Sequence, residues 1–424
     1  MSWIKASIAT SLAQLIRLAG GLILIKLVAS NLGPDGFGHL GHFMSFIAIL
    51  GVLAGGGILN GMVKYVAEYK FNRERLISFL SNALAYALFF STIIFFIMAY
   101  FAKAISLLFF NTIEFSGLII FLASIQYIYA LVNLCNGLLN GLRETLKFSK
   151  VIVVGTIFGL PFCCYFVIFY GFSGAVIALA LVNASLLIPA FVIIFRMNFF
   201  HSIKFSFNKK DSMSLFKFTM MQMVSLATLP IVEIYIRGFI AQEAGWHSAG
   251  LWQSMVRLSA VNLVFFSSFL SVYFVPTLSG MTDNDKSYAY VCKYILGIGS
   301  FFILVAGFIY IFRSFVFSMI FSPDFIIPSR WLAFQLLGDF FKIMAYVIGF
   351  YLLAKARLRL YVTAELIQSS LYLTITFAFA KFGDFSSVFP AYAVTYFIYF
   401  LICILAFYLL KRSFDPDKKG LISL

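Results

Sequence analysis

Charged residues are scarce in this chain. Asp, Glu, Lys and Arg make up only 11% of its 424 residues, whereas a soluble globular protein carries about 25%. Apolar residues make up 62%, more than a water-soluble core can bury, and intrinsic disorder needs the opposite composition. The composition therefore excludes a soluble enzyme and a disordered chain, and it predicts a protein whose solvent is the lipid bilayer.

Motifs for chemistry are also absent from the sequence. The five cysteines lie in apolar stretches without metal-ligand spacing, so we expect them to pack in the core. There is no Gly-Lys-Ser/Thr phosphate loop and no nucleophile elbow. His39 and His42 lie near the first predicted external turn, where we expect them at the membrane interface rather than on a metal. We therefore expect no metal and no bound cofactor.

Long apolar stretches, bounded by charges or by Gly, Pro and Asn, dominate the chain. They predict an all-α polytopic membrane protein with about twelve spanning helices. The expected spans are 4–30, 37–67, 77–101, 115–141, 149–171, 174–195, 213–241, 248–279, 288–312, 328–353, 358–380 and 386–410.

Basic residues indicate the orientation of these helices. Of the 31 Lys and Arg, six lie inside predicted spans, and only four lie in connections on the side opposite the N-terminus: Lys103, Arg313, Arg330 and Lys381. The remaining basic residues are in loops on the N-terminal side. Because basic loops stay in the cytoplasm, both termini are predicted to be cytoplasmic. The same rule explains the net charge of +15 without nucleic acid as a partner.

Two halves of six helices each are predicted, with the division in the basic loop near residues 196–212. The expected N-terminal bundle covers 1–205 and the C-terminal bundle covers 206–424. Short internal similarities support a duplication, because the turns at 36–41 and 245–250 both place two glycines five residues apart. Repeats of this kind are common in transporters, whose sites lie between the repeats.

Charges inside the spans are the main functional signal. A charge at the bilayer centre costs at least about 2.5–3.5 kcal/mol, so it must face water, a ligand or a partner. The three acids in the spans are Glu233, Asp339 and Glu365. The six cations are Arg17, Lys26, Lys64, Arg237, Arg257 and Lys342. The excess of cations predicts a cationic cavity for an anionic substrate.

Helical spacing groups these charges with other polar residues. Gln335, Asp339, Lys342 and Tyr346 form one stripe, and Tyr361, Glu365, Gln368 and Tyr372 form another. Further stripes are Thr219, Gln222, Glu233 and Arg237, and Gly56, Asn60, Lys64 and Glu68. A structural alternative is that the pairs Glu233–Arg237 and Asp339–Lys342 merely neutralise one another.

The segment Gly55-Gly56-Gly57-Ile58-Leu59-Asn60-Gly61-Met62-Val63-Lys64 resembles helix 2 of the bacterial Wzx-type flippases. The resemblance continues over essentially the whole chain. Its other motifs include Gly33-Pro34, Lys217-Phe218-Thr219, Leu251-Trp252-Gln253, Gln335-Leu336-Leu337-Gly338-Asp339 and Ala364-Glu365.

The resemblance implies a fold like that of the multidrug-efflux (MATE) transporters, with two six-helix bundles around a central cavity. It implies alternating access that moves undecaprenyl-pyrophosphate-linked oligosaccharide repeat units across the bacterial inner membrane, for O-antigen or related polysaccharide. The implied partners are a polymerase and a chain-length regulator. Arg17, Lys26, Lys64, Arg237 and Lys342 fall at charged positions of the family pattern.

The resemblance also leaves ion coupling open. The family pattern has an acid near position 260, which is alanine here. Coupling to H⁺ or Na⁺ would therefore use Glu233, Asp339 or Glu365. Alternative functions are a MATE-like drug antiporter, which would favour an acidic aromatic cavity, and a flippase for the peptidoglycan lipid precursor. A membrane enzyme is disfavoured because the external loops are short.

Overall fold

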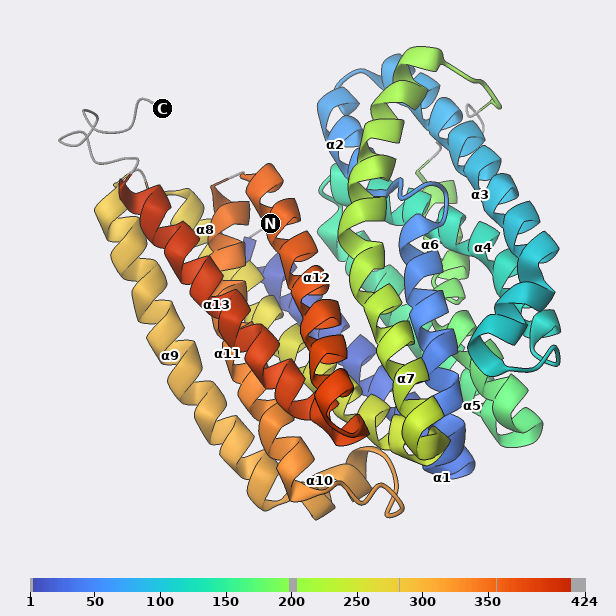
Figure 1. The fold of residues 1–424 in the computed structure, drawn as a ribbon. Coiled ribbons are helices and arrows are strands. Elements are labelled where there is room, and N and C mark those ends of the chain that lie inside the picture. The colour runs from blue at the N-terminus through green and yellow to red at the C-terminus, as the bar shows by residue number, and fades with distance from the viewer. Residues whose placement is uncertain (1–2, 198–203, 282, 356, 413–424) are drawn as a thin grey trace. The chain divides into compact units, whose positions relative to one another are not determined.

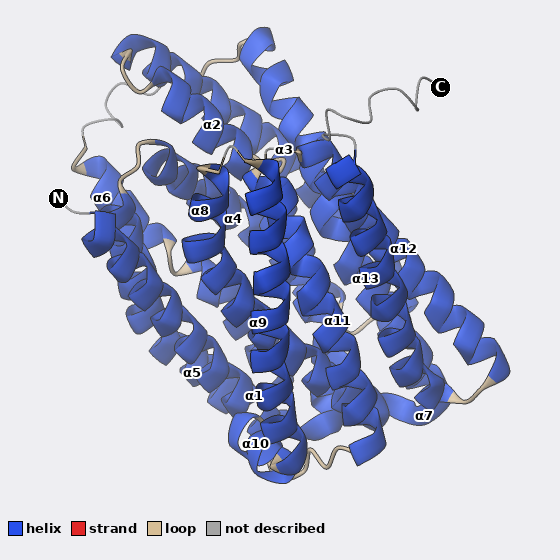
Figure 2. Ribbon diagram, turned by 90° about the vertical axis from the view of Figure 1, so that its left-hand side faces the viewer, coloured by secondary structure: helices blue, strands red, loops and turns tan. Residues whose placement is uncertain are grey.

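The computed structural model describes residues 3–412 except 198–203, 282 and 356. Within these residues the regular structure is entirely helical (Figure 2). The chain forms two compact units. Unit 1 comprises Met1–Gly238 with Ile320–Ser322, and unit 2 comprises Phe239–Met319 with Pro323–Leu424.

The helices of the two units follow one another along the chain (Figure 1). Unit 1 holds α1 (Trp3–Leu53), α2 (Leu59–Tyr69), α3 (Arg73–Phe110), α4 (Ser116–Gly141), α5 (Thr145–Ala184), α6 (Leu187–Phe195) and the first part of α7 (Lys209–Phe269). Unit 2 holds the rest of α7, the π-helical turn η2 (Leu270–Phe274), α8 (Val275–Ser279), α9 (Asn284–Ile311), most of α10 (Arg313–Ile320), α11 (Ser329–Ala354), α12 (Leu358–Phe382), the 3₁₀ turn η3 (Phe385–Ser387) and α13 (Val388–Arg412).

Three of the long helices are divided by a glycine. The backbone leaves the helical conformation at Gly33 (φ 62°), Gly171 (φ 53°) and Gly245 (φ 78°). Residues other than glycine rarely adopt these positive φ values. Gly33 and Gly245 lie between two predicted spans, Gly171 is the last residue of the predicted span 149–171, and α1 turns back on itself near the first of these glycines (Figure 1). The predicted connections at these three places are therefore confirmed.

One predicted helix is wrong in its details. The span 37–67 is interrupted, because α1 ends at Leu53 and α2 begins at Leu59. Between them Gly55, Gly56 and Gly57 all have positive φ, so the chain makes a turn there. Gly56 consequently does not share a helical stripe with Asn60 and Lys64, as the spacing had predicted.

Eight helices in the described part of the chain are long and apolar enough to cross a membrane. Two of them, Ala9–Leu53 and Thr145–Phe195, contain the breaks at Gly33 and Gly171, and each includes all or part of two predicted spans. The chain is thus a multi-pass membrane protein of the predicted all-helical class. The number of twelve crossings and the cytoplasmic termini stay predictions.

Unit 1 includes the first part of α7, beyond the predicted boundary at residue 205. A bidentate ion pair joins the start of α7 to α3. Arg75 donates from its two terminal nitrogens to the Asp211 carboxylate at 2.6 and 2.9 Å. Further along α7, the Tyr86 and Thr219 hydroxyls lie 2.7 Å apart. The compact unit ends within α7 at Gly238, whereas the predicted N-terminal repeat ends at residue 205. The repeat boundary between 205 and 206 stays a prediction.

Candidate functional site

A buried carboxylate is the centre of a polar cluster in unit 2. Asp339 of α11 is 3% exposed and accepts two hydrogen bonds. The Ser259 hydroxyl of α7 donates at 2.6 Å, and the Tyr392 hydroxyl of α13 donates at 2.7 Å. Gln335, one helical turn before Asp339, donates its amide to the Ser259 oxygen at 2.8 Å. Three helices thus converge on one carboxylate through hydrogen bonds.

Lys342 lies beside this carboxylate on α11 and is also buried, at 8% exposed. Its Nζ is 4.7 Å from the ring centroid of Tyr396 and 5.9 Å from that of Tyr392. The aromatic faces attract the ammonium group through cation–π interaction. The Gln368 amide on α12 donates to the Tyr396 hydroxyl at 3.2 Å, which adds a fourth helix to the cluster.

A glycine makes room for Tyr392 in this cluster. A Cβ atom added at Gly338 would collide with the Tyr392 ring. Gly338 therefore lets α13 approach α11 closely enough for the Tyr392 hydroxyl to reach Asp339. We call Ser259, Gln335, Asp339, Lys342, Gln368, Tyr392 and Tyr396 the unit 2 cluster.

Of the predicted stripe of α11, Gln335, Asp339 and Lys342 are buried in unit 2, and Tyr346 is half-buried. Asp339 and Lys342 interact electrostatically but form no close ion pair, so the alternative that they neutralise one another stays a prediction. Within the described residues, Nζ of Lys342 does not lie within 4 Å of the Asp339 carboxylate oxygens. The carboxylate points instead to the hydroxyls of Ser259 and Tyr392.

A second buried charge lies in unit 1. Arg237 of α7 is 0% exposed, and its guanidinium is 3.3 Å from Nδ1 of His42 and 3.4 Å from the Ser45 hydroxyl. Both of these partners are on α1. Glu233 is half-buried, and the alternative that it neutralises Arg237 stays a prediction. We call Arg237, His42 and Ser45 the unit 1 cluster.

His42 differs from its predicted interfacial environment. It is 1% exposed and lies against the rings of Phe109 and Phe110, with centroid distances of 5.8 and 5.4 Å. A Cβ atom added at Gly41 would collide with the Arg237 guanidinium. The bare backbone of α1 at this glycine therefore leaves the space in which the guanidinium reaches His42.

Two further cations of unit 1 have partners that are not acids. Arg17 of α1 donates from Nη2 to the Asn183 side-chain oxygen of α5 at 2.8 Å. Lys64 of α2 is exposed, and its Nζ lies 5.0 Å from the Tyr65 ring and 5.7 Å from the Phe218 ring. Both cations keep their terminal groups beside polar or aromatic groups of another helix.

Comparison with known proteins identifies the family of the chain. Residues 4–282 match the model of a family described as "Polysaccharide biosynthesis protein". The chain belongs to this family. A protein of Escherichia coli (strain K12) named "Lipid III flippase" is 32% identical over 416 residues, which are 97% of this chain and 100% of that protein. The lipid III flippase of Shigella flexneri is similar to the same extent. The predicted resemblance to polysaccharide flippases is thus confirmed.

Solved structures show the fold of this family member. An inward-facing multidrug resistance MATE transporter of the MOP superfamily superposes with a TM-score of 0.78 at 16% identity, over 96% of this chain and 100% of that one. The lipid II flippase MurJ, in an inward closed conformation, has a TM-score of 0.74 at 16% identity, over 95% of this chain and 87% of that one. The predicted MATE-like fold is confirmed.

The remaining predicted site residues differ in how deeply they are buried. Gln253 is buried, Arg257 and Glu365 are half-buried, and Lys26 and Asn60 are exposed. Asp339, Lys342 and Gln368 come together in the unit 2 cluster, and Arg237 belongs to the unit 1 cluster. Arg17, Lys26 and Lys64 belong to neither cluster.

Several residues of the two clusters were not predicted from the sequence. Ser259, Tyr392 and Tyr396 join the unit 2 cluster, and His42 and Ser45 join the unit 1 cluster. In a chain with 22 tyrosines and many serines in apolar helices, the tyrosines and serines carry no signal of their own, and His42 was expected at the membrane interface. Their partners are between 28 and 195 positions away, so spacing along one helix cannot find them.

Proposed function

We propose that the chain is a flippase rather than an enzyme. It moves undecaprenyl-pyrophosphate-linked oligosaccharide repeat units from the cytoplasmic to the periplasmic leaflet of the bacterial inner membrane by alternating access. The product serves O-antigen or a related surface polysaccharide. The family match and the full-length similarity to proteins named lipid III flippase support this function.

One structural observation supports the proposed binding of an anionic substrate. Lys342 is a buried cation in a membrane-spanning helix, and within the described residues no carboxylate is within 4 Å of it. A bilayer-embedded cation that forms no close ion pair can receive an anionic ligand. Ammonium and guanidinium groups bind phosphate through charge-assisted hydrogen bonds. Lys342 is therefore proposed to receive the pyrophosphate or an acidic sugar during transport.

The other predicted cations are proposed to share this task at different stages of the cycle. Arg237, with its side chain held beside His42 and Ser45, has a fixed direction and supplies a bidentate donor. Arg17, Lys26, Lys64 and Arg257 provide further positive charge. Asn60, Gln253 and Gln368 supply neutral hydrogen bonds, which suit the hydroxyl groups of sugars.

The acids are proposed to couple or gate transport. Asp339 holds hydroxyl donors from two other helices, so a change in its protonation or its ligands would alter the packing of α7, α11 and α13 together. Glu365 and Glu233 are the other candidates, with H⁺ or Na⁺ as the coupling ion. A polysaccharide polymerase and a chain-length regulator are the proposed partners in the membrane.

The decisive experiment is deletion of the gene in the source strain, with surface polysaccharide and lipid-linked repeat units measured together. We expect loss of the surface polymer and retention of complete repeat units on the cytoplasmic face. Wild-type protein should restore the polymer, and Lys342→Gln should not. Lys103→Gln, which alters an exposed lysine outside both clusters, is the matched control and should restore it.

Other results would favour the competing functions. Normal polysaccharide with increased sensitivity to drugs would indicate a MATE-like antiporter. Accumulation of the peptidoglycan lipid precursor on the cytoplasmic face would indicate a flippase for that lipid. Full complementation by Lys342→Gln would show that the buried lysine is structural.

A further inference from the structure

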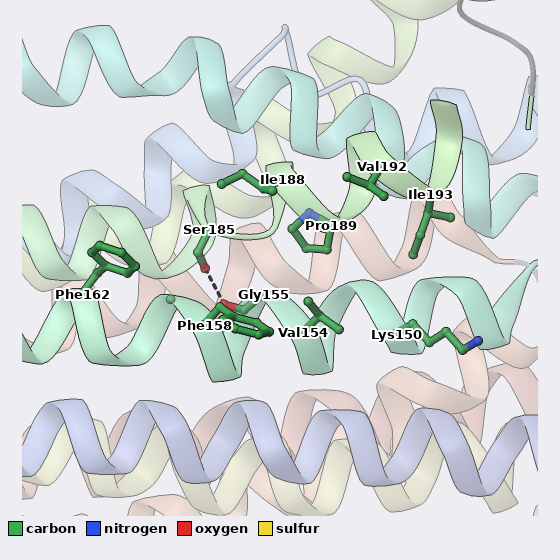
Figure 3. Close-up of a pocket in the computed structure, with 11 residues that line it drawn as sticks. Lys150, Val154, Gly155, Phe158, Phe162, Ser185, Ile188, Pro189, Val192 and Ile193 are labelled. Carbon is green, nitrogen blue, oxygen red and sulfur yellow. Dashed lines mark hydrogen bonds between the residues drawn. The ribbon is translucent and has the colours of Figure 1, made fainter. Parts of the chain in front are cut away.

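A groove outside both clusters runs along the surface of unit 1 between α5 and the segment of Ser185 and α6 (Figure 3). Its volume is about 470 Å³, within the range of about 300–1,000 Å³ that ligand pockets occupy. Phe158 and Phe162 of α5 lie on one side, and Ile188 and Val192 of α6 lie on the other. These four side chains are all exposed, with Ile188 at 74%, so the groove opens outward from unit 1.

Small residues shape the base of this groove. Cβ atoms added at Gly155 and Gly159 would collide with Leu186 and Ser185, so the two glycines allow the helices to approach closely. The Ser185 hydroxyl donates to the backbone oxygens of Gly155 and Val182, at 3.0 and 2.9 Å. Its donor is thus used within the protein, and the body of the groove offers mainly hydrocarbon to a ligand.

Of the residues that line the groove, the charged one lies at one end. Lys150 lies at the end opposite Phe162 (Figure 3). It is exposed, and among the described residues no acid forms an ion pair with it. By the distribution of basic residues, this end is predicted to lie on the cytoplasmic side. The groove therefore combines a long apolar body with one positive group near the cytoplasmic surface.

The length of the groove corresponds to one leaflet. From Lys150 to Phe162 an α-helix rises by about 18 Å, at 1.5 Å per residue. The hydrocarbon core of a bilayer is about 30 Å thick, so one leaflet is about 15 Å. A lipid whose phosphate lies at Lys150 would place its chain along the groove and reach the midplane near Phe162.

We propose that this groove binds the polyprenyl chain of the lipid-linked substrate in the cytoplasmic leaflet, with the phosphate nearest the chain beside Lys150. The inference rests on the proposed function and adds a site for the lipid part of the substrate. The groove is a single channel between two helices, which suits one hydrocarbon chain better than the paired chains of a phospholipid. The pyrophosphate supplies more negative charge for Lys150 than a phosphodiester does.

The test uses full-length protein in liposomes and a polyprenyl pyrophosphate that carries a photoreactive diazirine in its chain. After illumination, labelled residues are identified by mass spectrometry. We expect labelling within 154–162 and 188–193. A phosphatidylglycerol with a diazirine in one acyl chain, at equal concentration, should label these residues at least five-fold less.

Two variants test the groove and its charged end separately. Ile188→Trp fills the groove and should reduce polyprenyl labelling at least five-fold. Ile97→Trp, at an exposed position of α3 outside the groove, is the matched control and should leave it unchanged. Lys150→Gln should weaken labelling by the pyrophosphate but not by the uncharged polyprenol.

Equal labelling by both lipids, or unchanged labelling in Ile188→Trp, would overturn the proposal and show an ordinary lipid-facing surface. Translocation of the repeat unit by the same liposomes is measured in parallel. If wild-type protein is labelled in the groove but moves no repeat unit, the proposed function fails and the lipid site stands. If wild-type protein moves the repeat unit without groove labelling, the lipid site fails and the function stands.

Discussion

The Tyr392 hydroxyl donates a 2.7 Å hydrogen bond to the buried carboxylate of Asp339, 53 positions earlier in the chain. This bond joins α13 to α11 within the unit 2 cluster. Removing one partner of a buried polar group is costly, because the group loses a hydrogen bond that water does not replace. The relationship therefore makes Tyr392 a sensitive point for both stability and transport.

We expect Tyr392→Phe to lower the free energy of unfolding by about 1–3 kcal/mol, since Asp339 loses one donor while the ring is retained. Thermal unfolding in detergent would measure the loss. Tyr273→Phe removes a hydroxyl from an exposed tyrosine of η2 and is the matched control, with an expected change within about 0.5 kcal/mol. Equal effects of the two substitutions would contradict the assigned hydrogen bond.

Asp339→Asn tests the coupling role of the same carboxylate. The amide keeps the shape of the side chain but carries no charge and does not exchange a proton near neutral pH. If Asp339 carries the coupling proton, the variant should retain substrate binding and lose transport driven by a pH gradient. Liposomes with and without an imposed gradient would show this. Gradient-driven transport at the wild-type rate would exclude Asp339 as the coupling group.

Gly338 and Gly349 allow a comparison within α11. A Cβ atom at Gly338 would collide with the Tyr392 ring, whereas one at Gly349 would meet only Tyr361, at 3.7 Å. We expect Gly338→Ala to destabilise the protein by about 1–3 kcal/mol through overpacking. Gly349→Ala should be neutral or stabilising by up to about 1 kcal/mol, because alanine favours the helix. A neutral Gly338→Ala would mean that α13 can move away without loss.

How much of the fold and of the two clusters could be predicted depends on the kind of signal that the sequence carries. Asp339, Lys342 and Arg237 could be identified because a charge in an apolar helix is rare and costly. The breaks at Gly33, Gly171 and Gly245 could be located because polar residues and paired glycines bound the apolar stretches. The turn at Gly55–Gly57 was missed, since a glycine run inside an apolar stretch does not by itself distinguish a turn from close packing.

The partners of the charges could not be predicted. Periodicity relates residues on one helix, so it suggested that Asp339 pairs with Lys342 and Glu233 with Arg237. In the structure the carboxylate of Asp339 and the guanidinium of Arg237 have partners on other helices instead. Which helices meet is decided by packing over the whole chain, which spacing along a single helix does not contain.

The position of Arg237 can be tested without changing its charge. A methyl group at Gly41 would collide with the guanidinium, while a Cβ atom at Gly51, farther along the same helix, has no neighbour within 4 Å. We expect Gly41→Ala to displace Arg237 from His42 and to reduce repeat-unit transport at least ten-fold. Gly51→Ala should transport at the wild-type rate. Equal transport by the two variants would show that the placement of this guanidinium is unimportant.

The ion pair between Arg75 and Asp211 should contribute more stability than its position near the surface suggests. The Asp211 side chain is only 4% exposed and accepts from two guanidinium nitrogens, while the Arg75 side chain is 33% exposed. Asp211→Asn retains the shape but removes the charge, so we expect a loss of about 2 kcal/mol, in the range of hydrogen bonds to charged groups.

A second ion pair in unit 1 provides the comparison for Asp211→Asn. Lys147 and Glu144 are 40% and 39% exposed and lie at i, i+3, where such pairs are worth about 0.2–0.5 kcal/mol. Glu144→Gln should therefore change stability by less than 1 kcal/mol, and high salt should abolish this small effect while sparing most of the effect at Asp211. Thermal unfolding at low and high salt measures both. Because the Arg75–Asp211 pair fixes the first turn of α7 to α3, its loss should also raise proteolysis of the 204–212 segment, which Glu144→Gln should leave unchanged.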